Sequence, residues 1–114
     1  MMMKPFLAQV RQEGQRSVID LQGEINSAAE AGLLEAYQSA DASGAPTIVL
    51  NFSQVEYINS TGIALIIGLL AQARKVHKTL AVYGLSPHYR EIFEITRLVD
   101  FMQVFEDEAS AMAG

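Results

Sequence analysis

The stretch TIVLNFSQVEYINSTGIALIIGLLAQARKVHKTLAVYG, residues 47–84, determines the fold class of this chain. Its first four residues, 47–50, form a continuous β-branched and apolar run, which is typical of a strand covered on both faces. A polar stretch, 51–59, follows, and the apolar composition of residues 61–77 predicts a helix. Residues 80–83 predict another short strand. A strand, a helix and a strand in this order indicate parallel strands joined by a crossover helix.

The segment before this stretch predicts a hairpin followed by a helix. Apolar residues recur at every second position over 6–11, and residues 17–21 have the pattern of a returning strand. Asn26 or Ser27 is suited to cap a helix, because its side-chain oxygen would accept a hydrogen bond from a free amide group of the first turn. This helix would end at the turn residues 43–46, and its apolar positions recur at helical spacing at Ala29, Leu33, Ala36 and Tyr37.

The segment after residue 84 predicts a third helix, a last strand and a short C-terminal helix. Ser86 is suited to cap a helix that has Pro87 at its first position and ends near Thr96. Residues 99–105 predict the last strand, and residues 107–108 begin the C-terminal helix. We expect the side chains that point inward from these two helices to be those of Tyr89, Ile92, Phe93, Ile95, Ala109 and Met112.

The element order ββαβαβαβα predicts an α/β fold with a mixed, mostly parallel sheet that is covered by helices. The length of 114 residues corresponds to a single compact domain, which we place at residues 1–114. Half of the residues are hydrophobic and 18% are charged, which is typical of a globular chain. The net charge of −5 argues against nucleic-acid binding, because proteins with that function usually carry a basic face.

The sequence contains no segment that is expected to direct the chain into a membrane. The first residues lack the apolar core of a signal peptide. The longest apolar stretch, from Gly62 to Ala71, is about half of the ~20 residues that span a bilayer. We therefore expect a cytoplasmic protein without direct membrane insertion.

The sequence also lacks the usual constellations of an enzyme. It contains no cysteine, so it has no disulfide and no thiolate ligand for a metal. Its two histidines, His77 and His88, are eleven residues apart, which does not match metal-binding spacing. Neither a G-x-S-x-G nucleophile motif nor a glycine-rich nucleotide-binding loop is present. We expect no enzyme activity, and hence no catalytic residue, no cofactor and no metal site.

The junction over residues 57–62 places hydroxyl groups at the beginning of the apolar helix. Either Asn59 or Ser60 would act as the helix cap by accepting a hydrogen bond from a free backbone amide. A second interpretation is that Ser60 is phosphorylated, because a helix N-terminus offers free amides and a partial positive charge to a phosphate. The small Gly62 would leave room for a partner to approach the hydroxyl group. The two interpretations are compatible.

Four blocks of the sequence resemble, in order, those of STAS domains, the sulphate transporter and anti-sigma factor antagonist family. Asn59-Ser60-Thr61-Gly62-Ile63-Ala64 resembles the family signature Asp-Ser-Ser-Gly-Leu-Gly, and Leu21-Gln22-Gly23-Glu24-Ile25-Asn26 resembles the block Leu-x-Gly-Glu-Leu-Asp. Residues 47–52 resemble the family's central strand, and residues 85–98 resemble its third helix. The resemblance spans residues 6–108, and the length of the chain is similar to that of free-standing bacterial anti-sigma factor antagonists.

The resemblance implies a partner-switching function. In such systems the unphosphorylated antagonist binds an anti-sigma factor, and a sigma factor is released. The anti-sigma factor is also a serine kinase with a histidine-kinase-like ATPase fold, and a metal-dependent serine phosphatase reverses the modification. Carried over to this sequence, the phosphoacceptor is Ser60, with Thr61 as the second choice. The residues that the resemblance places at the partner surface are Glu24, Asn26, Tyr57, Asn59, Ser60, Thr61 and Gly62.

The sequence departs from the family pattern at this site. Asn26 and Asn59 stand where the family usually has aspartates, so each side chain keeps a capping oxygen and loses the charge. Thr61 replaces the second serine and keeps a hydroxyl group. An alternative function is that of a STAS accessory subunit that braces the ATPase of a membrane transporter without switching. A third possibility, serine catalysis by Ser60, lacks an evident base.

Overall fold

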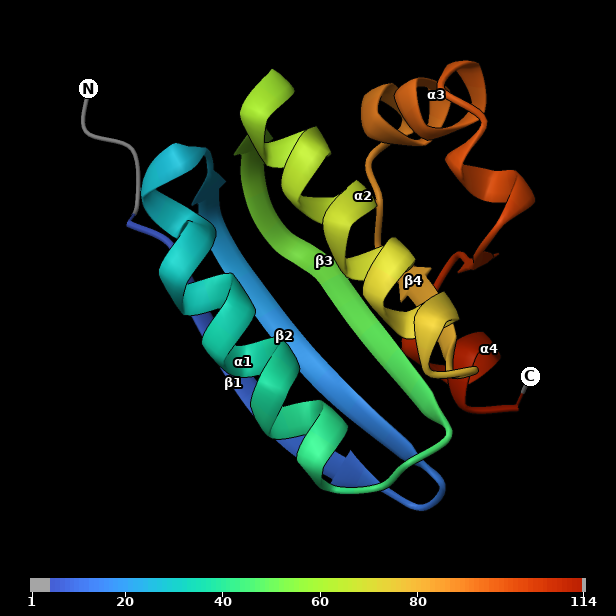
Figure 1. Cartoon of the computed structure of the whole chain (residues 1–114). Coiled ribbons are helices and arrows are strands. Elements are labelled where there is room, and N and C mark those ends of the chain that lie inside the picture. Colours follow the sequence, from blue (N-terminus) through green and yellow to red (C-terminus); the bar gives the residue numbers. More distant parts are fainter. Residues whose placement is uncertain (1–4, 114) are drawn as a thin grey trace.

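The computed structural model of this protein describes residues 5–113. Its strands are β1 (Leu7–Glu13), β2 (Arg16–Ile25), β3 (Thr47–Ile58), β4 (Thr79–Tyr83) and β5 (Gln103–Phe105). Its helices are α1 (Glu30–Ala42), α2 (Ser60–Lys75), α3 (Pro87–Ile95) and α4 (Glu108–Ala113), with 3₁₀ turns at Ser27–Ala29 and Leu98–Asp100. The strands form one sheet in the order β1-β2-β3-β4-β5, in which β1 is antiparallel to β2 and the remaining pairs are parallel. This confirms the predicted α/β fold with a mixed, mostly parallel sheet (Figure 1).

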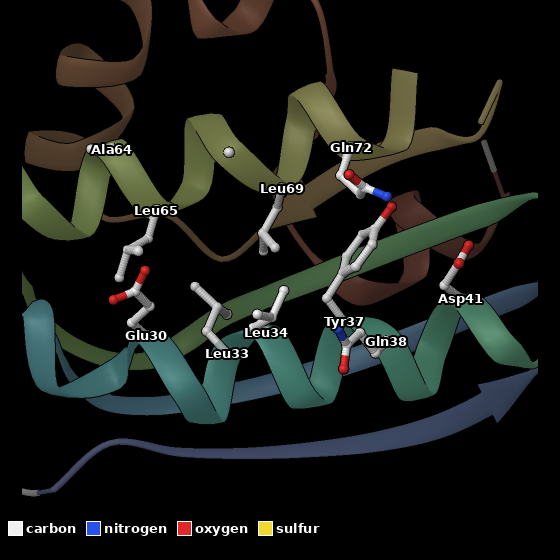
Figure 2. Close-up of a pocket in the computed structure, with 11 residues that line it drawn as sticks. Glu30, Leu33, Leu34, Tyr37, Gln38, Asp41, Ala64, Leu65, Leu69 and Gln72 are labelled. Atoms are coloured by element: carbon white, nitrogen blue, oxygen red, sulfur yellow. The ribbon is translucent and has the colours of Figure 1, made fainter. Parts of the chain in front are cut away.

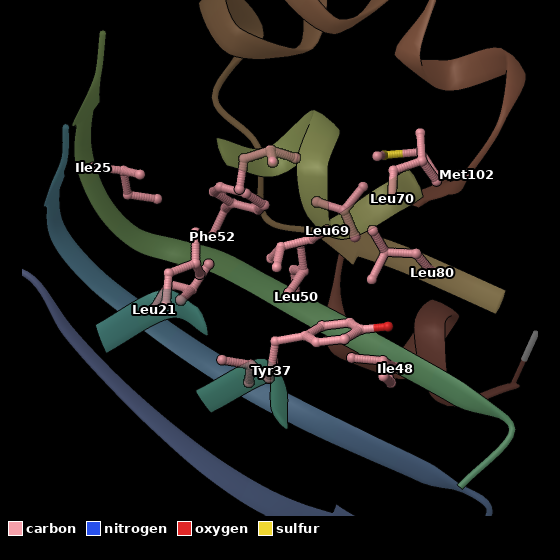
Figure 3. Close-up of a cluster of buried hydrophobic side chains, with 14 of the residues drawn as sticks. Leu21, Ile25, Tyr37, Ile48, Leu50, Phe52, Leu69, Leu70, Leu80 and Met102 are labelled. Carbon is pink, nitrogen blue, oxygen red and sulfur yellow. The ribbon is translucent and has the colours of Figure 1, made fainter. Parts of the chain in front are cut away.

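Two helices, α1 and α2, lie side by side on one face of the sheet, and α4 packs on the other face (Figure 1). On β3, Ile48 and Leu50 belong to the larger core beneath α1 and α2, whereas Val49 packs with Ala111 of α4. Figure 3 shows the larger core, with Leu50 and Phe52 among side chains of both helices. Ile48, Val49 and Leu50 are all 0% exposed. The prediction of a strand covered on both faces is therefore confirmed.

Strand β3 is longer than the sequence predicted. We expected a strand at 47–50 and a separate polar stretch at 51–59, but β3 continues to Ile58. The additional residues pair with the end of β2, and this parallel ladder finishes with Ile25 opposite Ile58. Because the exposed positions of this extension carry the polar side chains, its composition conceals the strand. The longer ladder brings the ends of β2 and β3 together at one edge of the sheet.

Two left-handed residues explain two element ends that the sequence placed incorrectly. The helix predicted over 61–77 ends before His77, which has a φ of 60°. The strand predicted over 99–105 is reduced to β5, because Arg97 has a φ of 66° and a 3₁₀ turn follows it. A residue in the left-handed region commonly terminates a helix. Neither residue is a glycine, the residue that most often marks a left-handed position, so these turns could not be predicted from composition.

Two of the predicted inward positions on the last helices are wrong. Phe93 of α3 is buried as expected, but Ile95 is 72% exposed. Ile95 follows Phe93 by two residues, which is about 200° around the helix, so it points away from the core. On α4, Ala109 is exposed and Ala111 is the residue buried against the sheet. Met112 packs partly against the same cluster, as predicted.

A polar network holds α4 against the sheet. The Arg11 guanidinium group lies 2.7 Å from Asp20 Oδ2 and 2.8 Å from Glu108 Oε1. The Tyr83 hydroxyl group donates to Glu108 Oε1 at 2.7 Å, and the Asn51 amide group donates to Asp20 Oδ1 at 2.8 Å. Burial raises the pKa of Asp20, but the hydrogen bonds from Arg11 and Asn51 outweigh burial and leave its pKa below the ordinary value. The network therefore favours the ionised form of Asp20.

We expect Asp20 to make the stability of the fold depend on pH. Its pKa is lower in the folded chain than in the unfolded chain, where it is about 3.9. Its contribution is therefore present above about pH 4 and is lost as the pH falls through the folded-state pKa. The Asp20→Asn variant should be less stable than the natural protein near neutral pH and should lose less stability on acidification to about pH 3. Urea denaturation at both pH values measures this, and an unchanged pH dependence would contradict the assignment.

Candidate functional site

Helix α2 begins immediately after Asn59, at the carboxyl end of β3 (Figure 1). Asn59 has an extended backbone, and its Oδ1 accepts a hydrogen bond from the Gly62 N–H at 2.8 Å. The Asn59 carbonyl oxygen accepts another from the Ile63 N–H at 2.9 Å. Asn59 is therefore the cap of α2. Of the two caps that the sequence allowed, Ser60 is not the one used, because it is the first residue inside the helix.

Replacement of the cap should cost more stability than replacement of the neighbouring serine. We expect Asn59→Ala to lower the free energy of unfolding by about 0.5–2 kcal/mol, because the Gly62 amide would lose its partner. Ser60→Ala should change it by less than about 0.5 kcal/mol, because Ser60 is exposed. Urea denaturation of the two variants measures the difference. A larger loss for Ser60→Ala would show that the serine side chain has a structural role.

The hydroxyl groups of Ser60 and Thr61 are carried by the exposed first turn of α2. The first amide groups of a helix have no partner within it, and its N-terminus carries about half a positive charge. A phosphate attached here would meet free donors and a favourable field. Both residues meet this requirement, so the geometry does not distinguish Ser60, the first choice from the resemblance, from Thr61, the second.

Gly62 has a different role from the one that the sequence suggested. We expected it to leave room for a partner at the hydroxyl group, but Gly62 is buried. A Cβ atom at this position would overlap the carbonyl oxygen of Ile25 and would lie 2.8 Å from Ile58 Cγ2. The small residue is required because the first turn of α2 packs directly on the ends of β2 and β3. Gly62 therefore faces the protein interior and not a partner.

Two residues that position the site were not identified from the sequence. The Ile25 carbonyl oxygen accepts a hydrogen bond from the Asn59 N–H at 3.2 Å. The Tyr89 hydroxyl group accepts one from the Ile58 N–H at 2.9 Å, which ties α3 to the end of β3. The sequence predicts only an apolar packing role for Tyr89. Its phenol hydroxyl group could have indicated this polar role, since a buried tyrosine usually finds a hydrogen-bond partner.

The other residues implied to contact a partner lie beside this turn. Glu24 is the register partner of Tyr57 at the ends of β2 and β3. Tyr57 is 42% exposed, and Glu24 is half-buried. Asn26 Oδ1 accepts a hydrogen bond from the Ala28 N–H at 2.9 Å and so caps the 3₁₀ turn before α1. The structure thus brings Glu24, Asn26, Tyr57 and the start of α2 to one edge of the sheet, as the resemblance implied.

Both asparagines that replace the family's aspartates act as caps through a side-chain oxygen. Capping requires only an acceptor, so Asn26 and Asn59 retain the structural role without the negative charge.

None of the helices within residues 5–113 is long and apolar enough to cross a membrane. Over the same range, no group of three or more His, Cys, Asp and Glu side chains is arranged to hold a metal ion.

Sequence comparison relates the chain to one family. A family model described as "Mlab, STAS domain" matches residues 8–104, which include every residue of the site described above. The putative anti-sigma factor antagonist BtrV of Bordetella bronchiseptica is 35% identical to this chain over 94 residues. This alignment covers 82% of this chain and 80% of BtrV.

Comparison with solved structures finds a similar fold in anti-sigma factor antagonists. An anti-sigma factor antagonist from Mycobacterium paratuberculosis has a TM-score of 0.83 at 21% identity, covering 96% of this chain and 92% of that one. The Bacillus cell fate determinant SpoIIAA in its phosphorylated form has a TM-score of 0.69 at 24% identity. This match covers 91% of this chain and 96% of the SpoIIAA chain. At these identities the similarity is one of fold.

Proposed function

This chain belongs to the STAS domain family, and we propose that it is an anti-sigma factor antagonist whose binding is controlled by phosphorylation of Ser60. The observation that carries the proposal is the division of roles at the start of α2. Asn59 makes the capping hydrogen bond, so the exposed Ser60 hydroxyl group is available for modification. BtrV, whose sequence aligns with most of this chain, supports the antagonist assignment.

In the proposed cycle, the unphosphorylated protein binds an anti-sigma factor through the edge that holds Glu24, Asn26, Tyr57 and Ser60. The partner is a serine kinase with a histidine-kinase-like ATPase fold, and the circuit operates in the cytoplasm, where ATP is available. The Ser60 oxygen attacks the γ-phosphorus of ATP, the bond to the β–γ bridging oxygen breaks, and ADP and a proton leave. A metal-dependent serine phosphatase then hydrolyses the phosphoserine with water, which yields serine and inorganic phosphate.

The site of modification can be tested with the purified full chain, the cognate kinase and magnesium ATP. We expect the natural protein to gain one phosphate, and Ser60→Ala to gain none, because the attacking hydroxyl group is absent. Thr61→Ala is the matched control and should still gain one phosphate, because it retains the Ser60 hydroxyl group. Intact-mass measurement reports the outcome. Equal phosphorylation of Ser60→Ala would transfer the assignment to Thr61.

The alternative function, a subunit that braces a transporter ATPase, calls for a permanent apolar surface. Ile67 of α2 and Phe101 are 45% and 53% exposed, and with Arg74 they line a shallow depression on the side of α2. Affinity capture of the tagged full chain from its native cells separates the two functions. Capture of a kinase-like partner by the natural chain but not by Ser60→Asp supports switching. Capture of a membrane-associated ATPase by the natural chain but not by Ile67→Ser supports bracing.

A further inference from the structure

Helices α1 and α2 enclose a groove of about 470 Å³ on the outer surface of the molecule. The groove is separate from the exposed hydroxyl groups at the start of α2. Figure 2 shows side chains of both helices projecting towards it. The residues that line it come from α1 (Glu30, Leu33, Leu34, Tyr37, Gln38 and Asp41) and from α2 (Ala64, Leu65, Gly68, Leu69 and Gln72). A volume of this size is within the range of small-molecule sites.

The middle of the groove is apolar and open. Leu33 and Leu69 form buried parts of its wall, and Leu34 is 48% exposed at its rim. A Cβ atom added to Gly68 would meet no atom within 4 Å. The absence of a side chain at Gly68 therefore enlarges the groove and is not required by helix packing. The groove follows α1 from Glu30 to Asp41, which is about 16 Å at the helical rise and suits an elongated molecule.

One polar atom at this groove has no partner within the described structure. The hydroxyl oxygen of Tyr37 is buried and makes no hydrogen bond there, and the residue is 2% exposed. In Figure 2 its ring extends from α1 towards α2, near the end of the groove that also holds Gln38 and Gln72. Burial and the charge of Asp41 raise the pKa of Tyr37, so the hydroxyl group keeps its proton at neutral pH. A buried donor of this kind favours an occupant that carries an acceptor.

The charges around the groove limit the occupant further. Glu30 and Asp41 stand at its two ends, and none of the described lining residues is basic. Asp41 is already paired with Lys78, whose Nζ lies 2.8 Å from Asp41 Oδ1. An anionic ligand would therefore meet the carboxylate of Glu30 and no cation of the lining. The groove is suited to an uncharged molecule.

We propose that this groove binds an uncharged aliphatic molecule whose hydroxyl or carbonyl oxygen accepts a hydrogen bond from Tyr37. Its hydrocarbon chain would lie over Gly68 between the leucines of α1 and α2. Its polar end would lie at Tyr37 and Gln72. This ligand satisfies the unpartnered hydroxyl group and covers the apolar wall at the same time.

The test uses the ¹⁵N-labelled full chain and two probes of equal length, 1-octanol and octanoate. We expect 1-octanol to produce saturable amide shifts at Leu34, Gly68 and Gln72, with a Kd on the order of 1 mM. Octanoate should bind at least about tenfold more weakly, because its carboxylate would lose water in a groove whose described lining carries the carboxylates of Glu30 and Asp41 and no basic residue. Equal affinity for the two probes, or no saturable shift at these residues, would overturn the proposal.

Two variants and one control locate the binding. Gly68→Leu should abolish the 1-octanol shifts by filling the groove, and leucine has a higher helix propensity than glycine, so the variant should fold. Tyr37→Phe should weaken 1-octanol binding about tenfold, since the donor is lost. Ile67→Ala, on the same helix but outside the groove, should bind as the natural protein does. Unchanged binding by Gly68→Leu or Tyr37→Phe would refute the site.

Discussion

Phosphorylation of Ser60 is expected to weaken binding of the anti-sigma factor by more than about a hundredfold and to leave the fold of this protein nearly unchanged. The partner's surface must fit closely around the hydroxyl group during phosphoryl transfer. A phosphate left in place adds a charge of about −1.5 to −2, which this surface would have to desolvate without a prepared counter-charge. A penalty of about 3 kcal/mol corresponds to the expected loss, because each 1.4 kcal/mol is tenfold in affinity.

The fold should tolerate the phosphate for reasons that are local to α2. The capping bond belongs to Asn59 and is not broken by a change at Ser60. The first amide groups and the helix dipole favour an anion at this position. The switch would therefore act through local repulsion and steric mismatch at the contact surface, without a large conformational change.

Titration calorimetry with the anti-sigma factor, together with circular dichroism of the free protein, measures both halves of this prediction. Ser60→Asp should weaken binding less than the phosphate does, because it adds one charge and fewer oxygens. Ser39→Asp, an exposed position on α1, is the matched control and should bind normally. Equal affinity of the two phosphorylation states would remove the switch. Lost binding accompanied by a large spectral change would keep the switch and refute the local mechanism.

The largest expected effect on stability is that of Gly62→Ala. We expect this single methyl group to lower the free energy of unfolding by about 3 kcal/mol, because overpacking at a rigid site forces backbone shifts. The added Cβ would overlap the carbonyl oxygen of Ile25, which itself accepts the Asn59 N–H at 3.2 Å. The backbone of β2 cannot retreat without loosening that hydrogen bond and the adjacent ladder.

The second glycine of α2 provides the control for this prediction. Gly68→Ala places the same methyl group in the same helix, where it meets no atom within 4 Å. It should stabilise the protein by about 0.5–1 kcal/mol, because alanine loses less conformational entropy than glycine in a helix. Urea denaturation of the two variants compares them directly. A Gly62→Ala variant as stable as Gly68→Ala would contradict this prediction, because it would show that the backbone of β2 can shift away from α2 at little cost in stability.

Local features of this protein could be predicted from the sequence because their causes lie within a few residues. The continuous β-branched and apolar run at residues 47–50 predicted the buried centre of the sheet, where Ile48, Val49 and Leu50 lie. Ser86 and Pro87 gave the beginning of α3, and Ser86 Oγ does accept the Tyr89 N–H. The junction before α2 was located correctly, with the cap limited to Asn59 or Ser60. Caps and periodicity depend on neighbours in the chain, which a sequence displays.

Features that depend on distant parts of the chain were decided only by the tertiary structure. Strand β3 extends past residue 50 because β2 supplies the pairing partner for its backbone, whatever its own polarity. The choice of Asn59 as the cap, the burial of Gly62 and the hydrogen bond from the Ile58 N–H to Tyr89 all follow from how α2 and α3 meet the strand ends. Each of these contacts has a backbone group as one of its partners, and a backbone group is the same in every residue. Side-chain patterns therefore identified the hydroxyl groups of the site, and only the packed chain shows which backbone groups hold them in place.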